Sequence, residues 1–289
     1  MLAAAAALAA SPAPHTMTWE ELDALPKPPA DRRIAYGEGS LQFGELLLPK
    51  GAGPFPVAIV IHGGCWRAEY DHLHATPLAA ALTAHGVATW TIEYRRIGDP
   101  GGGWPGTFED VARATDHLRA IAPEFHLDLS RVVAIGHSAG GHLALWAAAR
   151  RALPAGAPGA SADALPLRGV IGLAAIGDLR EYANGASWCM KSAPLLMGGT
   201  PDSLPERYAI VDPSELLPLH VPVRLVHGTL DKIVPIAQSR AFAARAQSKG
   251  DDVRLVELEG EAHFDLVAPH GKAFDAIEEA VKELSAKKP

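Results

Sequence analysis

The chain has 289 residues, of which 48% are hydrophobic and 20% charged, and its net charge is −7. This is ordinary globular usage and excludes a largely disordered chain. The acidic balance argues against a nucleic-acid binder, which needs a basic face to neutralise phosphates, and provides no attraction to an anionic membrane surface. At this length, one α/β domain with insertions fits better than two small domains.

The N-terminal residues 1–31 are interpreted as an extension of the folded body. Residues 1–13 are alanine-rich and resemble the apolar part of a secretory signal, although no Lys or Arg precedes them. The stretch is shorter than the roughly 20 apolar residues of a membrane span. Read as a signal remnant, it favours a periplasmic or secreted location over a cytoplasmic one; the alternative is a frayed tail. The proline-rich residues 26–31 cannot continue a helix, so we expect the folded body to begin near Arg32.

From Arg32 onward, apolar runs alternate with helix-forming stretches. Strands separated by helices imply crossover connections, so the pattern predicts an α/β fold with a mainly parallel central sheet flanked by helices. The expected strands are 34–36 and 41–48 as an antiparallel pair, then 57–61, 87–94, 132–135, 170–175, 223–226 and 253–258; the expected helices are 73–85, 108–121, the stretch after Ser138, 236–248 and 272–284.

Residues 177–219 interrupt this alternation. The segment is longer than a normal connection and carries large apolar side chains among Pro and Gly. We expect a lid-like insertion that covers the site. The alternative is a segment that packs against the folded body and does not control access to the site.

A nucleophile is indicated at residues 136–140, which read Gly-His-Ser-Ala-Gly between an apolar run and a helix-forming stretch. A serine in a strained turn between strand and helix needs glycines at positions where side chains would clash with the backbone. We therefore predict Ser138 as the nucleophile, against the alternative of an ordinary glycine turn.

Two downstream loops supply partners for this serine. A serine hydroxyl needs a histidine to accept its proton and a carboxylate to orient that histidine. Asp231 follows the strand at 223–226, and His263 follows the last strand, so we assign them these roles. Asp178 is the rival acid, although it lies nearer the insertion. His137, next to the serine, is expected to point away from the hydroxyl and to have a structural role.

An oxyanion hole is predicted at His62-Gly63-Gly64-Cys65-Trp66, which follows the strand at 57–61. Glycines allow a close approach of the backbone, so the amides of Gly64 and Cys65 can join that of Ala139, the residue after the nucleophile. The alternative is that His-Gly-Gly merely ends a strand.

The cysteines and histidines indicate no metal. Cys65 and Cys189 are too few for a zinc site of four cysteines and stand in no ligand spacing, and the 13 histidines are scattered. Whether the two cysteines form a disulfide with each other stays open.

Together these motifs resemble the α/β-hydrolase superfamily, particularly its His-Gly-Gly-x-Trp carboxylesterase and kynurenine-formamidase-like branch, from roughly Phe55 to the C-terminus. The order Ser, Asp, His along the chain is the one this fold uses. The resemblance implies an α/β-hydrolase domain over 32–289, with Ser138 as nucleophile, Asp231 as orienter and His263 as base. Cys65 departs from the pattern, since an aromatic residue or glycine is commoner there.

The sequence thus predicts a serine hydrolase that cleaves small carboxylic esters through an acyl-enzyme on Ser138 and needs no cofactor. The nearest alternative is an arylformamidase of the N-formylkynurenine type; a small peptidase ranks third, and a non-catalytic binding protein of a different class ranks last. Trp66, Trp104 and Trp188 are expected to frame the substrate, although aromatic residues more often fill cores. The expected partner is a small ester or amide; no membrane span is expected, and a homodimer is allowed.

Overall fold

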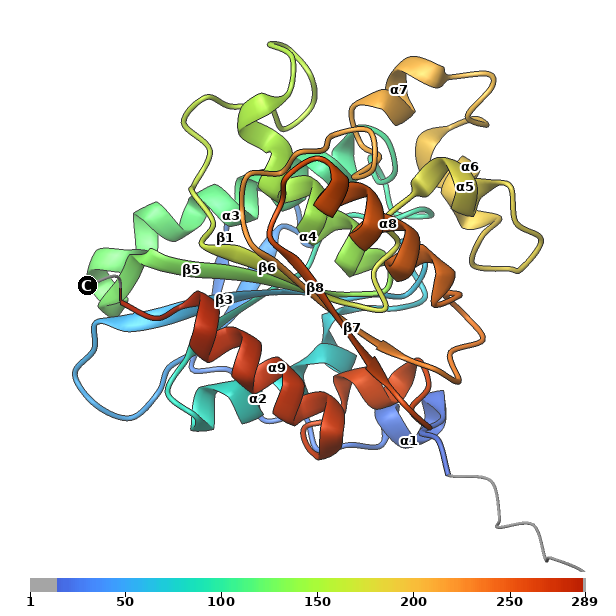
Figure 1. Cartoon of the computed structure of the whole chain (residues 1–289). Coiled ribbons are helices and arrows are strands. Elements are labelled where there is room, and N and C mark those ends of the chain that lie inside the picture. The colour runs from blue at the N-terminus through green and yellow to red at the C-terminus, as the bar shows by residue number, and fades with distance from the viewer. Residues whose placement is uncertain (1–14, 288–289) are drawn as a thin grey trace, which may run out of the picture.

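The structure is a computed structural model that describes residues 15–287 (Figure 1). An eight-stranded sheet runs through the molecule in the order β1-β2-β4-β3-β5-β6-β7-β8. Its β1–β2 and β2–β4 pairs are antiparallel, and the other neighbours are parallel. The predicted α/β architecture is therefore confirmed. The strands are β1 (Arg32–Ala35), β2 (Phe43–Leu47), β3 (Phe55–Ile61), β4 (Ala88–Ile92), β5 (Leu127–His137), β6 (Gly169–Leu173), β7 (Val223–Gly228) and β8 (Val253–Leu258).

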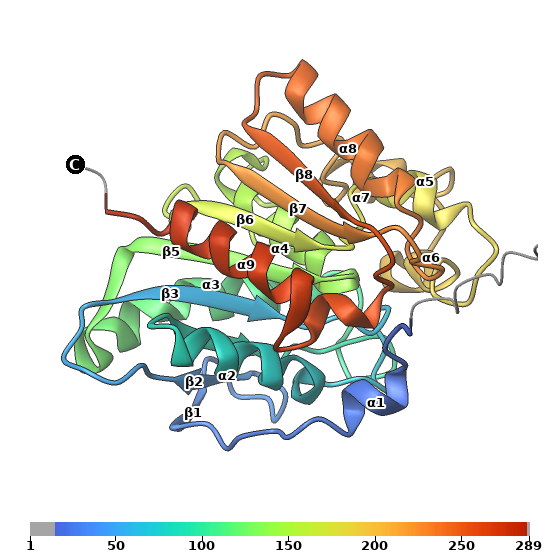
Figure 2. The same cartoon turned by 60° about the horizontal axis from the view of Figure 1, so that its bottom comes forward.

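Helices cover both faces of the sheet. Figures 1 and 2 show α2 and α9 on one face and α3, α4 and α8 on the other. The main helices lie within a few residues of the expected ranges, except that the first begins as a 3₁₀ turn, η1 (His72–Ala75). The α-helices are α1 (Trp19–Asp23), α2 (Thr76–Ala84), α3 (Gly106–Phe125), α4 (Ala139–Ala149), α5 (Leu179–Ala183), α6 (Ser192–Met197), α7 (Pro205–Ala209), α8 (Ala237–Ser248) and α9 (Gly271–Leu284); two further 3₁₀ turns are η2 (Arg150–Ala152) and η3 (Phe264–Val267).

The central strands are apolar on both sides because helices cover both sides. In β3 the side chains from Val57 to Ile61 are all buried. This strand pairs with β5 in a register that sets Ile61 opposite Gly136. The loop that follows β3 therefore lies beside the turn that follows β5, which places the two sequence motifs together.

The folded body begins before Arg32, contrary to the sequence-based expectation. Helix α1 is closed at its start by a capping box, in which Thr18 and Glu21 bind each other's backbone amides. Leu22 is fully buried, and the amide of Met17 donates to Asp265 Oδ1 over 2.9 Å. These contacts fasten α1 to the body despite the proline-rich stretch that follows it. The proposed signal remnant lies outside the described residues.

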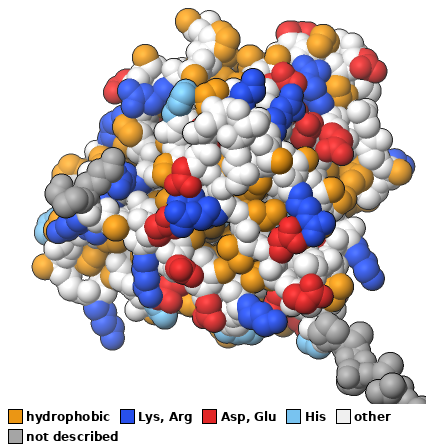
Figure 3. All heavy atoms as spheres, viewed as in Figure 1, with side chains coloured by type: hydrophobic (Ala, Val, Ile, Leu, Met, Phe, Trp, Pro, Cys, Tyr) orange, Lys and Arg blue, Asp and Glu red, His pale blue; other side chains and the backbone are white. Residues whose placement is uncertain are grey.

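The 177–219 segment contains the short helices α5, α6 and α7 (Figure 1). Tyr182, Leu196 and Tyr208 from these helices are fully buried, so the segment is packed against the body. Within residues 15–287, no helix has both the length and the apolar character to cross a membrane. On the face shown in Figure 3, basic and acidic side chains are interspersed and form no single basic surface.

Candidate active site

Ser138 stands in a strained turn between β5 and α4. Its φ of 56° and ψ of −119° lie outside the regions that L residues prefer. A Cβ on Gly136 would lie 2.1 Å from the carbonyl oxygen of Gly140, and a Cβ on Gly140 would lie 2.1 Å from that of Ile61. The glycines on both sides of the serine are therefore required by lack of space. This turn presents Ser138 to a cavity.

His263 and Asp231 form a hydrogen-bonded pair at the same edge of the sheet. His263 Nδ1 lies 2.7 Å from Asp231 Oδ2. Because a carboxylate can only accept, Nδ1 carries the proton and Nε2 is left as the basic nitrogen. His263 and Ser138 line the same cavity, so the imidazole and the hydroxyl face a common space.

Asp231 is held in its ionised form. Burial by itself would raise its pKa, but hydrogen bonds from His227 and His263, together with the amide of Val234, hold that pKa well below its usual range. The amides of Ile233 and Val234 donate to Oδ1 over 2.8 and 2.9 Å. Asp231 is therefore a fixed negative charge that orients His263 and can stabilise its protonated form.

The other acidic and basic candidates have structural contacts. Asp178 caps α5 by accepting from the amide of Glu181 over 2.8 Å, so it is engaged away from His263. His137 Nε2 donates to the backbone oxygen of His263 over 3.0 Å, and the two rings lie 4.4 Å apart. Burial and the neighbouring His263 hold the pKa of His137 well below its usual value, so it stays neutral. His137 thus holds the backbone of His263 in place and also lines the cavity.

The loop after β3 supplies free backbone donors beside Ser138. Among residues 15–287, the amides of Gly64, Cys65 and Ala139 donate no hydrogen bond. Gly64 and Cys65 line the cavity, and Ala139 begins α4 directly after the serine. A Cβ on Gly64 would lie 2.3 Å from the Cβ of Tyr70, so only glycine fits there. These amides are available to bind an oxygen that develops negative charge.

A disulfide joins Cys65 to Cys189, which resolves the question that the sequence left open. The two residues are 124 positions apart, and their Cα atoms lie 5.2 Å apart. The bond connects the loop after β3 to the 177–219 segment. Cys65 therefore has a structural side chain and carries no free thiol.

The cavity has a volume of about 270 Å³ and is walled largely by aromatic rings. Of the three tryptophans expected around a substrate, Trp188 lines the cavity and is 51% exposed. The expectation for Trp66 is wrong, because its ring is fully buried and packs edge-on against His142. The expectation for Trp104 is also wrong, because its ring packs against Phe108 and under the guanidinium of Arg207.

Several residues of the cavity wall were missed from the sequence. Trp19 of α1 has its ring 4.9 Å from that of Tyr70 and 5.7 Å from that of Phe264, and all three line the cavity. The Thr18–Glu21 capping box is the sequence signal that predicts α1, but no local pattern shows where its tryptophan points. The cavity is completed by His74, Ser187, Lys232 and Ile233.

Within residues 15–287, no group of three or more His, Cys, Asp or Glu side chains is placed to hold a metal ion. The site described above consists of a serine, an imidazole paired with a carboxylate, and free amides. This arrangement is suited to attack on a carbonyl carbon, with a general base and stabilisation of the resulting oxyanion.

The chain is similar to a family model and to proteins named as esterases. A family model described as BD-FAE matches residues 45–245. Esterase LipC of Mycobacterium tuberculosis is 29% identical over 82% of this chain and 60% of its own length, and esterase LipQ of the same organism is 30% identical over 74% and 51%. The chain thus spans little more than half the length of these curated relatives.

Solved structures share the fold. A truncated carbohydrate esterase from gut microbiota superposes with a TM-score of 0.78 at 21% identity, covering 90% of this chain and 99% of that one. The esterase Est2 of Thermogutta terrifontis gives a TM-score of 0.72 at 21% identity, covering 93% and 99%.

Proposed function

The chain belongs to the BD-FAE family of the α/β-hydrolase superfamily, and we propose that it is a serine hydrolase of small carboxylic esters. The observation that carries the proposal is a cavity lined by Ser138, His263, Gly64 and Cys65, with His263 hydrogen-bonded to Asp231 over 2.7 Å. The names of the relatives, esterases LipC and LipQ, support the same reaction class.

In the proposed reaction, His263 Nε2 takes the hydroxyl proton of Ser138 as the serine oxygen attacks the ester carbonyl carbon. The carbonyl oxygen becomes negatively charged and is bound by the amides of Gly64, Cys65 and Ala139, an interaction commonly worth about 3 kcal/mol per donor. His263 then passes the proton to the leaving alcohol, which leaves an acyl group on Ser138. Water, deprotonated by the same imidazole, releases the acid and restores the serine.

Protonation of His263 during attack is the step that Asp231 assists. The imidazolium forms beside an ionised carboxylate that accepts from Nδ1 over 2.7 Å. The carboxylate stays ionised because its pKa is held well below its usual range. The carboxylate of Asp231 therefore stabilises the positive charge that develops on the imidazole of His263, and no proton moves to Asp231.

The cavity limits the substrate that reaches Ser138. A volume of about 270 Å³ suits a small ester rather than a long acyl chain. The rings of Trp19, Tyr70, Trp188 and Phe264 provide apolar walls for a flat or aliphatic group. The same aromatic walls favour an N-formyl arylamine, of the N-formylkynurenine type, as the second candidate substrate.

The disulfide bears on the location of the chain. Disulfides persist in oxidising compartments and are rare in the cytosol. The Cys65–Cys189 bond therefore supports a periplasmic or secreted location. The homodimer that the sequence allows stays a prediction, which sedimentation velocity tests.

A substrate panel tests the proposed function. Purified wild type and Ser138→Ala are assayed with p-nitrophenyl acetate, butyrate and octanoate and with N-formylkynurenine. We expect wild type to turn over the acetate and butyrate fastest, the octanoate poorly, and Ser138→Ala none of them measurably. Turnover of N-formylkynurenine alone would replace the esterase assignment with the second candidate, and no turnover of any panel member would contradict both.

A further inference from the structure

We propose that the Cys65–Cys189 disulfide holds the Cys65 amide where it binds the oxyanion, so that the chain is fully active only while this bond is intact. The inference rests on the proposed function and names Cys189 as a positioning residue. It concerns the one covalent connection, within the described residues, between the oxyanion loop (residues 62–67) and the 177–219 segment.

The oxyanion loop has a backbone conformation that the sequence does not favour by itself. Gly64, Cys65 and Trp66 follow each other with φ values of 99°, 52° and 57°. Residues with a side chain occupy this left-handed region rarely, and two in succession persist only where the surroundings enforce them. The direction of the Cys65 amide depends on these dihedral angles, so whatever fixes them also positions that donor.

The loop is held at both ends. At its N-terminal end, the hydroxyl of Tyr94 donates to the backbone oxygen of His62 over 2.8 Å. At the C-terminal end, the amide of Ile97 donates to the oxygen of Trp66 over 2.8 Å, and the Trp66 ring is fully buried. The amide of Arg67 donates back to the oxygen of Gly64 over 3.0 Å. Cys65 itself has its amide free, and the disulfide is the contact that ties it to the neighbouring segment. The disulfide therefore acts at the residue whose amide the proposed reaction uses.

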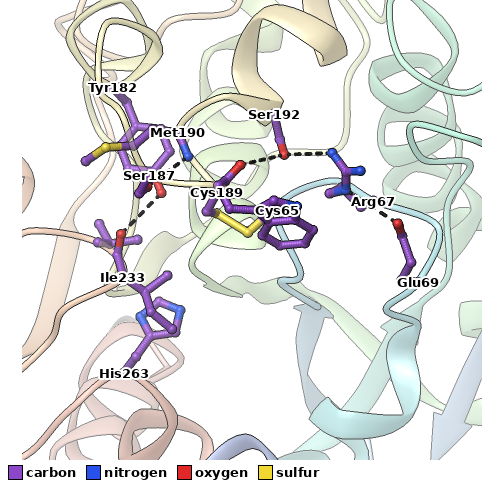
Figure 4. Close-up of a disulfide and its surroundings, with 12 residues drawn as sticks. Cys65, Arg67, Glu69, Tyr182, Ser187, Cys189, Met190, Ser192, Ile233 and His263 are labelled. Atoms are coloured by element: carbon purple, nitrogen blue, oxygen red, sulfur yellow. Dashed lines mark hydrogen bonds and ion pairs between the residues drawn. A yellow bond between two sulfur atoms is a disulfide. The ribbon is translucent and has the colours of Figure 1, made fainter.

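Weaker contacts join the same two segments (Figure 4). Arg67 donates to Ser192 Oγ over 3.3 Å, and its guanidinium lies 4.6 Å from the centre of the Trp188 ring. The hydroxyl of Ser192 in turn donates to the oxygen of Trp188 over 3.3 Å. These contacts survive cleavage of the disulfide, so we expect its loss to lower activity and not to abolish it.

The disulfide also sets one wall of the cavity. Cys189 directly follows Trp188, and both line the space in front of Ser138. Loss of the bond therefore affects ground-state contacts with the substrate as well as the oxyanion donor. A test has to separate these two effects, because only the second one is specific to the proposal.

Reduction is a defined two-electron step. A dithiol such as dithiothreitol attacks one sulfur as a thiolate, and the mixed disulfide that forms is resolved by the second thiol of the reagent. The S–S bond of the protein becomes two thiols, and the dithiol becomes a cyclic disulfide. The same loss is made permanent by Cys189→Ser, and by Cys65→Ala with Cys189→Ala if the single variant does not fold.

The experiment compares two inhibitors that differ only at one carbon, a trifluoromethyl ketone and the matching methyl ketone. The first adds to an activated serine and carries an oxyanion, whereas the second binds largely as a neutral carbonyl. Both touch the wall that Trp188 forms, so the ratio of their inhibition constants isolates the oxyanion contact. The ratio and kcat for p-nitrophenyl acetate are measured in oxidised wild type, reduced wild type and Cys189→Ser, each shown to be folded by circular dichroism.

In reduced wild type and in Cys189→Ser, we expect the ratio of the inhibition constants of the two ketones to shift about tenfold against the trifluoromethyl ketone. We expect kcat to fall about tenfold or more in the same two proteins. The reason is that full removal of an oxyanion donor costs about 10²–10³ in kcat. Dithiothreitol has no further effect on Cys189→Ser. Tyr208→Phe is the matched control: it removes a hydrogen bond to Gly199 elsewhere in the 177–219 segment and leaves the ratio unchanged.

An unchanged ratio and unchanged kcat after reduction would overturn the proposal. Equal weakening of both ketones would overturn it too, because it would show a role in the cavity wall alone. Failure of the trifluoromethyl ketone to inhibit oxidised wild type would instead reject the proposed function itself, so the two failures are distinguishable.

Discussion

His263 Nδ1 donates to Asp231 Oδ2 over 2.7 Å, although the two residues are 32 positions apart in the chain. Asp231 follows β7, and His263 follows β8, its parallel neighbour. The ends of two adjacent strands thus bring an acid and a base together. The contact fixes the ring so that Nε2 is the basic nitrogen in a cavity that also contains Ser138.

Replacing Asp231 with Asn removes the charge that orients His263. The Asn amide can donate to Nδ1 and so favours the tautomer with the proton on Nε2, which cannot accept the serine proton. We expect kcat for p-nitrophenyl acetate to fall about 10³–10⁴-fold with the fold retained. Steady-state kinetics and circular dichroism measure both.

Asp178→Asn is the matched control for that variant. Asp178 caps α5, and asparagine is an equally good cap, so activity should stay within about twofold of wild type. A loss of activity in Asp178→Asn as large as that in Asp231→Asn would show that the acid has been assigned to the wrong residue.

Trp19 is predicted to contribute to substrate binding from outside the region matched by the family. Its ring contacts Tyr70 and Phe264 in the cavity wall. Trp19→Ala should raise KM for p-nitrophenyl butyrate about tenfold, equivalent to about 1.4 kcal/mol, with kcat nearly unchanged. Trp19→Phe should restore most of the binding because it keeps an aromatic wall. Wild-type KM in a folded Trp19→Ala protein would count against this role.

Asp212 makes stability depend on pH in the direction opposite to an ordinary paired carboxylate. Burial is the main cause that raises the pKa of Asp212 to about 7, and the charge of Asp178 raises it further. Hydrogen bonds from backbone amides lower the pKa but do not offset the effect of burial. Between about pH 4 and pH 7 the folded chain keeps this proton while the unfolded chain has lost it. The contribution of Asp212 to the free energy of unfolding is therefore fully present below about pH 4 and is lost as the pH rises from about 4 to 7.

Asp212→Asn removes this proton from the folded state. The free energy of unfolding of wild type, measured by urea at pH 5, 6 and 7, should fall relative to that of the variant by about 1.4 kcal/mol from pH 5 to pH 6. It should fall by less from pH 6 to pH 7, where the folded carboxyl begins to ionise. The difference between the two proteins cancels the contributions of other groups. Two parallel curves would contradict the assignment.

Gly140→Ala tests the space around the nucleophile turn. In an exposed helix, Gly to Ala stabilises by about 1 kcal/mol. Here the new Cβ would lie 2.1 Å from the oxygen of Ile61 and 2.4 Å from that of His62, both backbone atoms. We expect a net destabilisation of about 1–3 kcal/mol in urea unfolding. A more stable variant would show that the turn can move away from β3.

The sheet and the main motifs could be predicted because they depend on local patterns. The apolar run at Val57–Ile61 fits a strand covered on both faces, and the pentapeptide at residues 136–140 has the glycines that a tight strand-to-helix turn requires. Parallel strands end at one edge, so Asp231 and His263 could be expected near each other without knowledge of the pairing order.

The walls of the cavity could not be predicted because they depend on tertiary packing. Trp66 belongs to the motif yet points into the core, whereas Trp19 comes from the segment interpreted as an extension and lines the cavity. No spacing shows which tryptophan faces solvent or substrate. The Cys65–Cys189 bond likewise depends on how the 177–219 segment folds back onto the oxyanion loop.

Mass spectrometry after reaction with a fluorophosphonate tests the central claim most directly, because this reagent adds only to a serine whose hydroxyl is activated. In wild type, the peptide that contains Ser138 should gain the mass of one phosphonyl group, and His263→Ala should remain unlabelled although folded. An unmodified Ser138 in active wild type, or labelling of another serine in its place, would contradict the account.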